Sequence, residues 1–170
     1  MVRVIDNFLE EKYFKEIQDF VFQESFPWYH KEYDVEDNNK NLNGFFYHSL
    51  YNNYKFDSQF PPCFNHLFAK LKILAPVRIQ LNLVVRDIDC KESKWHVDAR
   101  YNKKVTTAIF YLNDNNGKTA LKLEDGIKTV DSKANRVLVF RSDIEHKAIY
   151  QTDVHKRYLL NMNYIEDGNN

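Results

Sequence analysis

The segment at residues 77–85 constrains the fold most, because polar and apolar side chains alternate along almost all of it. Arg78, Gln80 and Asn82 occupy one set of alternate positions. The other set is apolar and comprises Ile79, Leu81, Leu83 and Val85. Successive side chains of a β-strand point to opposite faces, so this pattern predicts a strand with one polar and one apolar face.

Further β-rich runs follow this strand, and turn-like sequence separates them. Asp125 and Gly126 predict a hairpin turn between two of the runs. Before residue 77, apolar residues at helical spacing predict two helices, and polar or Pro-containing stretches predict loops at 26–30 and 34–43. The expected helices span residues 9–23 and 61–72, and the further strands span 106–112, 120–123, 127–130, 137–140, 146–150 and 157–164.

This order of elements predicts the fold class. Many short antiparallel strands after N-terminal helices are typical of a mostly β fold, either a barrel or a double-sheet jelly roll. We expect a single domain over residues 1–170, with a helical and loop support region at 1–75 and a jelly-roll core at 76–165.

Composition narrows the class of protein. The chain has 170 residues, of which 44% are hydrophobic and 15% aromatic, enough for one domain with a substantial core. The formal net charge is zero, so there is no electrostatic signature of a nucleic acid or membrane partner. The N-terminal residues lack a signal-peptide core, and no apolar run approaches the ~20 residues of a spanning helix. We therefore expect a cytoplasmic protein, and its oligomeric state stays open.

Two histidines and an aspartate form a candidate metal site. His96 and Asp98 are separated by one residue, so both can reach one ion from a strand end, and His146 follows later. Two imidazoles and one carboxylate leave three positions of a six-coordinate iron open, whereas structural zinc is usually closed by four ligands rich in Cys. Cys63 and Cys90 lack the spacing of a zinc or redox motif. For His96 and Asp98 alone, a surface pair or an ordinary hydrogen-bonded histidine remains the alternative.

The last predicted strand carries a candidate anion anchor. Period two places Arg157, Asn161 and Asn163 on one face and Lys156 on the other, so Arg157 and Lys156 cannot serve the same pocket. If the polar face lines a cleft, Arg157 is a buried cation for a dicarboxylate, which its guanidinium can bind through paired hydrogen bonds. If that face meets water, Arg157 is an ordinary surface residue. Periodicity alone leaves both readings open.

Several motifs together resemble a known family. They are Trp-His-Val-Asp at 95–98, Thr-Ala-Ile-Phe-Tyr-Leu-Asn at 107–113, Asn-Gly-Lys-Thr at 116–119, Asn-Arg-Val-Leu-Val-Phe at 135–140, His146, and Arg-Tyr at 157–158. The chain resembles 2-oxoglutarate- and Fe(II)-dependent oxygenases of the prolyl-hydroxylase-like group, and most of all their small stand-alone members from phages of marine bacteria. The resemblance spans nearly the whole chain and implies a double-stranded β-helix, the cupin-like jelly roll.

The resemblance also implies roles for individual residues. The residues that match its iron ligands are His96, Asp98 and His146. Arg157 matches the residue that pairs with the distal carboxylate of 2-oxoglutarate, Tyr111 resembles a tyrosine that binds the same carboxylate, and Asn82 would assist at the keto-acid end. Leu159 and Asn163 depart from the family pattern, where a Ser or Thr and an aromatic residue are common. Asp98 argues against the halogenating relatives, which have a small residue there.

The implied function is hydroxylation of an unactivated C–H bond, with release of succinate and CO2. The implied cofactors are Fe(II), 2-oxoglutarate as co-substrate and O2, with ascorbate as an additional reductant. A prolyl residue of a protein or peptide leads among the substrates by analogy, and a free amino acid, a sugar or a nucleobase stays open. Two other classes remain: a non-catalytic metal-binding jelly-roll module, and a structural component that binds no metal.

Overall fold

The computed structural model describes residues 2–31, 44–86, 92–98 and 104–168, and the expected loop at 34–43 lies outside them. The helices are α1 (Glu11–Val21) and α2 (Cys63–Lys70). The strands are β1 (Arg3–Ile5), β2 (Tyr29–Lys31), β3 (Phe45–Asn52), β4 (Lys55–Phe56), β5 (Ile73–Val85), β6 (Val105–Tyr111), β7 (Lys118–Leu123), β8 (Gly126–Asp131), β9 (Arg136–Arg141), β10 (His146–Ile149) and β11 (Lys156–Glu166). No helix in this described part of the chain is long and apolar enough to cross a membrane.

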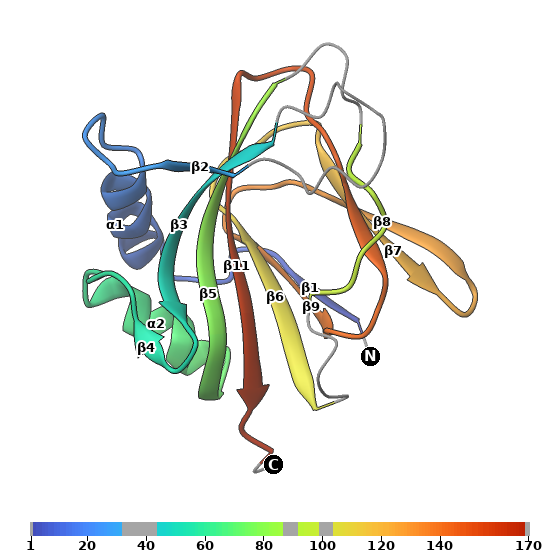
Figure 1. The fold of residues 1–170 in the computed structure, drawn as a ribbon, viewed down its shortest axis with the longest axis horizontal. Helices are drawn as coiled ribbons and strands as arrows, with labels where there is room; N and C mark the ends of the chain where they lie inside the picture. The colour runs from blue at the N-terminus through green and yellow to red at the C-terminus, as the bar shows by residue number, and fades with distance from the viewer. Residues whose placement is uncertain (1, 32–43, 87–91, 99–103, 169–170) are drawn as a thin grey trace.

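The strands form two antiparallel sheets of a double-stranded β-helix, as the sequence predicts. The larger sheet has the order β1-β9-β6-β11-β5-β3-β2, and β4 pairs with β3 at its margin. The smaller sheet has the order β10-β7-β8, in which β7 and β8 form the predicted hairpin. Both helices lie on one side of the larger sheet, and the smaller sheet lies towards the other (Figure 1).

Apolar faces attach the helices to the larger sheet. Phe14, Ile17 and Val21 recur along one face of α1 and are buried, as their helical spacing predicts. They belong to the same core cluster as side chains on the face of the larger sheet that meets the helices, among them Leu81 of β5 and Leu160 of β11. A separate apolar cluster fills part of the space between the two sheets.

The central strands β5 and β11 have the alternation that the sequence predicts. Leu81 and Leu160 face the helices, whereas Asn82 and Asn161 line a cavity on the opposite face. Arg157 also lines the cavity and is fully buried, while its neighbour Lys156 is exposed. The polar face of β11 therefore points inward and not into water.

The first 75 residues contribute strands that the sequence analysis did not anticipate. β3 pairs with β5, β2 extends the sheet beyond β3, and β1 pairs with β9 at the other edge. Residues 29 and 30, expected in a loop, belong to β2. β3 begins with consecutive aromatic residues, so it lacks the period-two contrast by which the other strands were recognised.

Candidate metal centre

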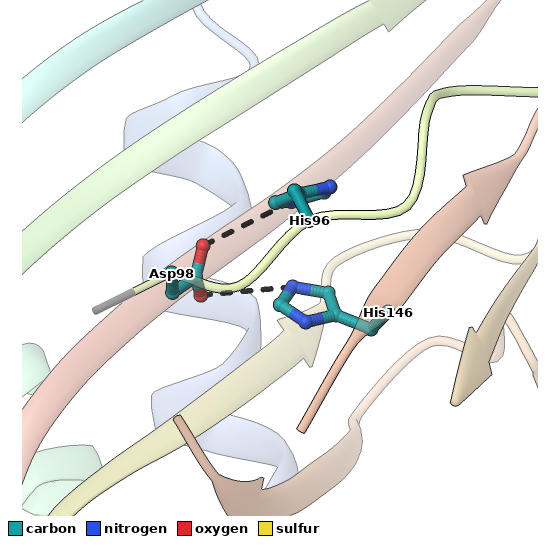
Figure 2. A group of neighbouring side chains, drawn as sticks. All are labelled: His96, Asp98 and His146. Atoms are coloured by element: carbon teal, nitrogen blue, oxygen red, sulfur yellow. Dashed lines mark ion pairs between the residues drawn. The ribbon is translucent and has the colours of Figure 1, made fainter. Parts of the chain in front are cut away.

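His96, Asp98 and His146 meet at one point, with their ligand atoms all within 4.8 Å of one another. His96 Nε2 lies 4.0 Å from Asp98 Oδ1, and His146 Nε2 lies 3.8 Å from Asp98 Oδ2. Figure 2 shows the Asp98 carboxylate pointing towards both imidazoles, one from the segment at 92–98 and the other from β10. Backbone hydrogen bonds of 3.0 and 2.9 Å join His96 and His146 in an antiparallel bridge, so the fold itself holds the two rings together.

Both histidines present the nitrogen that a metal ion needs. His96 Nδ1 lies 3.0 Å from the Lys94 carbonyl oxygen, and His146 Nδ1 lies 3.1 Å from that of Ile144. A carbonyl oxygen only accepts, so each Nδ1–H donates and each Nε2 keeps its lone pair. Burial lowers the pKa of His146 below its ordinary value, which favours the neutral form that binds metals.

Asp98 is an ionised carboxylate held by a polar network. Burial opposes its ionisation, but the nearby Arg78 guanidinium, followed by His146 and Asn163, outweighs that effect, and the pKa of Asp98 lies below its ordinary value. Arg78 Nη2 donates to Asp98 Oδ1 at 3.1 Å. Asn161 and Asn163 donate to Oδ2 at 3.2 and 3.1 Å. The donor set of two neutral imidazoles and one carboxylate fits Fe(II) with open positions.

Arg157 is a buried cation whose hydrogen-bonding capacity is half used. Its Nη1 donates to the carbonyl oxygens of Ile149, at 3.0 Å, and Lys118, at 3.4 Å. Its Nε and Nη2 are buried without a hydrogen-bond partner among the residues that the structure describes. Burial lowers the pKa of Arg157 below its ordinary value. Burying the N–H donors of a charged group without acceptors costs free energy, and an anionic ligand in the cavity would supply those acceptors.

Tyr111 lies behind the cavity wall and acts on it through Thr119. The Tyr111 hydroxyl donates to Thr119 Oγ1 at 2.7 Å, and Arg157 Cζ lies 5.7 Å from the centre of the Tyr111 ring. Thr119 and Tyr150 line the cavity, whereas Tyr111 is not among the lining residues in the described part of the chain. Because Thr119 Oγ1 already accepts a hydrogen bond from Tyr111, its own hydroxyl hydrogen can point to another acceptor. Neither Thr119 nor Tyr150 was singled out from the sequence, since a lone hydroxyl on a strand carries no pattern.

The three candidate metal ligands and Arg157 line the same cavity, of about 510 Å³. Asn82 lines it as well and accepts a hydrogen bond from Gln80 Nε2 at 2.5 Å. The side-chain oxygen of Asn161, Oδ1, is also buried without a hydrogen-bond partner among the described residues. The other side chains that line the cavity are Lys31, Phe45, Arg78, Gln80, Val84, Ser93, Lys94, Val97, Ile109, Lys147, Ala148 and Leu159.

No family model and no curated protein matches the sequence. Solved structures do match the fold. A prolyl-4-hydroxylase from Pseudomonas putida has a TM-score of 0.67 and 13% identity, over 98% of this chain and 93% of that chain. An oxidoreductase of the 2OG-Fe(II) oxygenase family from Burkholderia pseudomallei has a TM-score of 0.72 and 12% identity, over 99% and 87%.

A third similar structure is the non-haem α-ketoglutarate-dependent epimerase SnoN from nogalamycin biosynthesis, with a TM-score of 0.70 and 12% identity over 97% of this chain and 78% of that chain. SnoN has also been solved in complex with Fe3+, α-ketoglutarate and nogalamycin RO. At these identities the likeness establishes only the fold, a jelly roll, and the activity must be argued from the site.

Proposed function

We propose that this protein is an Fe(II)- and 2-oxoglutarate-dependent dioxygenase that hydroxylates an unactivated C–H bond. One observation carries the proposal: a His-Asp-His cluster and a buried arginine with two orphaned donors line one cavity. A structure described as a 2OG-Fe(II) oxygenase shares the fold, and so does an α-ketoglutarate-dependent epimerase that was solved with Fe3+ and α-ketoglutarate. These likenesses support the proposal without selecting a substrate.

Each residue has a defined task in this proposal. The metal would be held by His96, Asp98 and His146, and the distal carboxylate of 2-oxoglutarate would bind Nε and Nη2 of Arg157. The Thr119 hydroxyl, polarised by Tyr111, would donate a further hydrogen bond to that carboxylate. Bound Fe(II), with O2, supplies oxidative decarboxylation of 2-oxoglutarate to succinate and CO2, coupled to hydroxylation of the substrate.

Prolyl residues of a peptide are the first substrate class to test, since one structure with this fold is a prolyl-4-hydroxylase. Asn82 and the orphaned Asn161 carbonyl oxygen line the cavity beside the metal site and would hydrogen-bond a ligand there. Ascorbate would act as an added reductant in such assays.

The test is anaerobic reconstitution with Fe(II) and 2-oxoglutarate, followed by visible absorption for the weak charge-transfer band of a chelated keto acid. We expect the band in the wild type, its loss in His96→Ala and Asp98→Ala, and weakening at limiting 2-oxoglutarate in Arg157→Met. Arg3→Met, which removes only an exposed ion pair with Glu166, is the matched control and should keep the band. On admission of O2, succinate should form.

The alternative is a jelly-roll module that binds metal without turnover. Iron that binds without the band, and without succinate in air, would favour that module. A wild-type protein that binds no divalent metal would refute both readings.

A further inference from the structure

A row of polar side chains crosses three neighbouring strands directly beneath Asp98. Arg78 of β5 is paired in register with Asn163 of β11, and Asn163 is paired in register with Thr107 of β6. Side chains at paired positions lie on the same face of a sheet, so these three residues form one continuous row, which we call the Arg78–Asn163–Thr107 layer. Asn163 is 1% exposed and Thr107 is fully buried.

Hydrogen bonds fix the orientation of each group in this layer. Arg78 Nε donates to Asn163 Oδ1 at 3.0 Å. Asn163 Nδ2 uses its two hydrogens on Thr107 Oγ1, at 2.9 Å, and Asp98 Oδ2, at 3.1 Å. With the amide reversed, its oxygen would face the Asp98 carboxylate and its NH2 would face the guanidinium, so both contacts would become repulsive. Arg78 therefore determines which end of the Asn163 amide meets Asp98.

The donors divide unequally between the two oxygens of Asp98. A carboxylate oxygen has two lone pairs in its plane, and both pairs of Oδ2 are engaged by the amides of Asn161 and Asn163. The Thr107 hydroxyl is also near Oδ2, at 3.5 Å. Among the described residues, the donor to Oδ1 is Arg78 Nη2, at 3.1 Å, and these residues leave one lone pair of Oδ1 for another partner.

We propose that Arg78, Asn161 and Asn163 are positioning residues that hold the Asp98 carboxylate in one orientation, with Oδ1 as the oxygen presented to the metal. This inference rests on the proposed function, because it needs a metal at the His96–Asp98–His146 cluster. It also explains why an asparagine stands at position 163: an aromatic side chain there could not donate to Oδ2 and Thr107 together. Partners that orient a ligand in this way typically contribute 10–100-fold to metal affinity.

Two charge-preserving substitutions test the layer. Asn163→Leu keeps the volume and the net charge but removes both amide contacts. Arg78→Lys keeps the positive charge but replaces a fork that reaches two acceptors by a point charge. Arg3→Lys is the matched control, since Arg3 likewise donates to a carboxylate, that of Glu166, whose two oxygens lie 2.7 and 3.0 Å from its Nη2 on the surface.

The measurement is Mn²⁺ affinity by calorimetry, with electron paramagnetic resonance of the bound ion. We expect Asn163→Leu to weaken Mn²⁺ binding roughly 10–100-fold and to broaden the spectrum of the bound ion, because Asp98 then adopts several orientations. Arg78→Lys should show a smaller loss, and Arg3→Lys none.

The outcomes separate this inference from the proposed function. If the wild type binds Mn²⁺ and both variants match its affinity within about twofold, with unchanged spectra, the positioning role is wrong while the metal site stands. A lower unfolding temperature without metal, at unchanged Mn²⁺ affinity, would make the layer merely structural and also overturn the inference. If the wild type itself binds no Mn²⁺, the proposed function and the inference fall together. Should Asn163→Leu fail to fold, Arg78→Lys and Asn161→Leu decide the question by the same readouts.

Discussion

Replacing Arg157 by methionine should abolish tight 2-oxoglutarate binding while leaving the metal site intact. Arg157 is fully buried, and its Nε and Nη2 lack partners among the described residues. Two hydrogen bonds from these atoms to a carboxylate, at about 1.5–3 kcal/mol each, amount to about 3–6 kcal/mol. A loss of that size raises the Kd for 2-oxoglutarate roughly 10²–10⁴-fold. Methionine replaces the unbranched, aliphatic part of the arginine side chain and removes the charge and all donors.

The assay is calorimetric titration of the Mn²⁺-loaded protein with 2-oxoglutarate, supported by thermal unfolding. At a ligand concentration 100 times the Kd, binding should stabilise the wild type by about 2.7 kcal/mol. For a chain of this size that corresponds to a rise in Tm of about 5–11 °C. Arg157→Met should show no such rise at the same concentration, while Arg141→Met, which removes an exposed ion pair with Asp143, should keep it. A Kd for Arg157→Met within about threefold of the wild-type value would refute the anchor.

Three further predictions follow from the structure. Gly117→Ala should weaken 2-oxoglutarate binding and leave Mn²⁺ binding unchanged, because a Cβ at this position would lie only 2.9 Å from Arg157 Nη1 and would displace the guanidinium. Calorimetry with both ligands checks this, and an unchanged Kd for 2-oxoglutarate would contradict it. Burial lowers the pKa of His146 in the folded protein. As the pH falls below about 6.5, His146 is therefore protonated in the unfolded chain before it is protonated in the folded protein, and the free energy of unfolding decreases until the pH reaches the folded-state pKa. Urea unfolding of the metal-free protein should show this loss in the wild type, and less of it in His146→Gln. Phe110→Ala should lower the free energy of unfolding by about 3–5 kcal/mol, because its ring is fully buried in the core beneath α1; a loss under about 1 kcal/mol in denaturant titrations would contradict this.

The fold could be predicted where side-chain periodicity and burial coincide. β5 and β11 are central strands with one face on the helices and one on the cavity, so their alternation is strong and their positions were predicted. The short edge strands β1 and β2 are exposed along their length, and β3 begins with consecutive aromatic residues. No contrast between faces marks such segments, and their membership of the sheet depends on pairing with distant strands.

The residues of the candidate site could likewise be predicted only in part. His96, Asp98 and His146 could be named because metal ligands are limited to a few residue types, and the structure brings those three together. The partners of Asp98 could not be named, because Arg78 and Asn163 meet only through the register of β5 against β11. Register is set by the whole sheet and is invisible in the local sequence.

The two arginine charges of the cavity, Arg157 fully buried and Arg78 partly exposed, are held in opposite ways, and under the proposed function this difference would give the site its selectivity. Arg78 already has a carboxylate partner in Asp98, so it gains little from a second anion. Arg157 has tyrosine and backbone carbonyl neighbours, and its unmatched donors favour any ligand that brings a carboxylate to them. A dicarboxylate can satisfy Arg157 with one end and a metal at the histidine cluster with the other, whereas a monocarboxylate must leave one of the two unsatisfied. Leaving a buried charge without its partner costs several kcal/mol, so the unpaired state of Arg157 predicts that a dicarboxylate binds more tightly than a monocarboxylate.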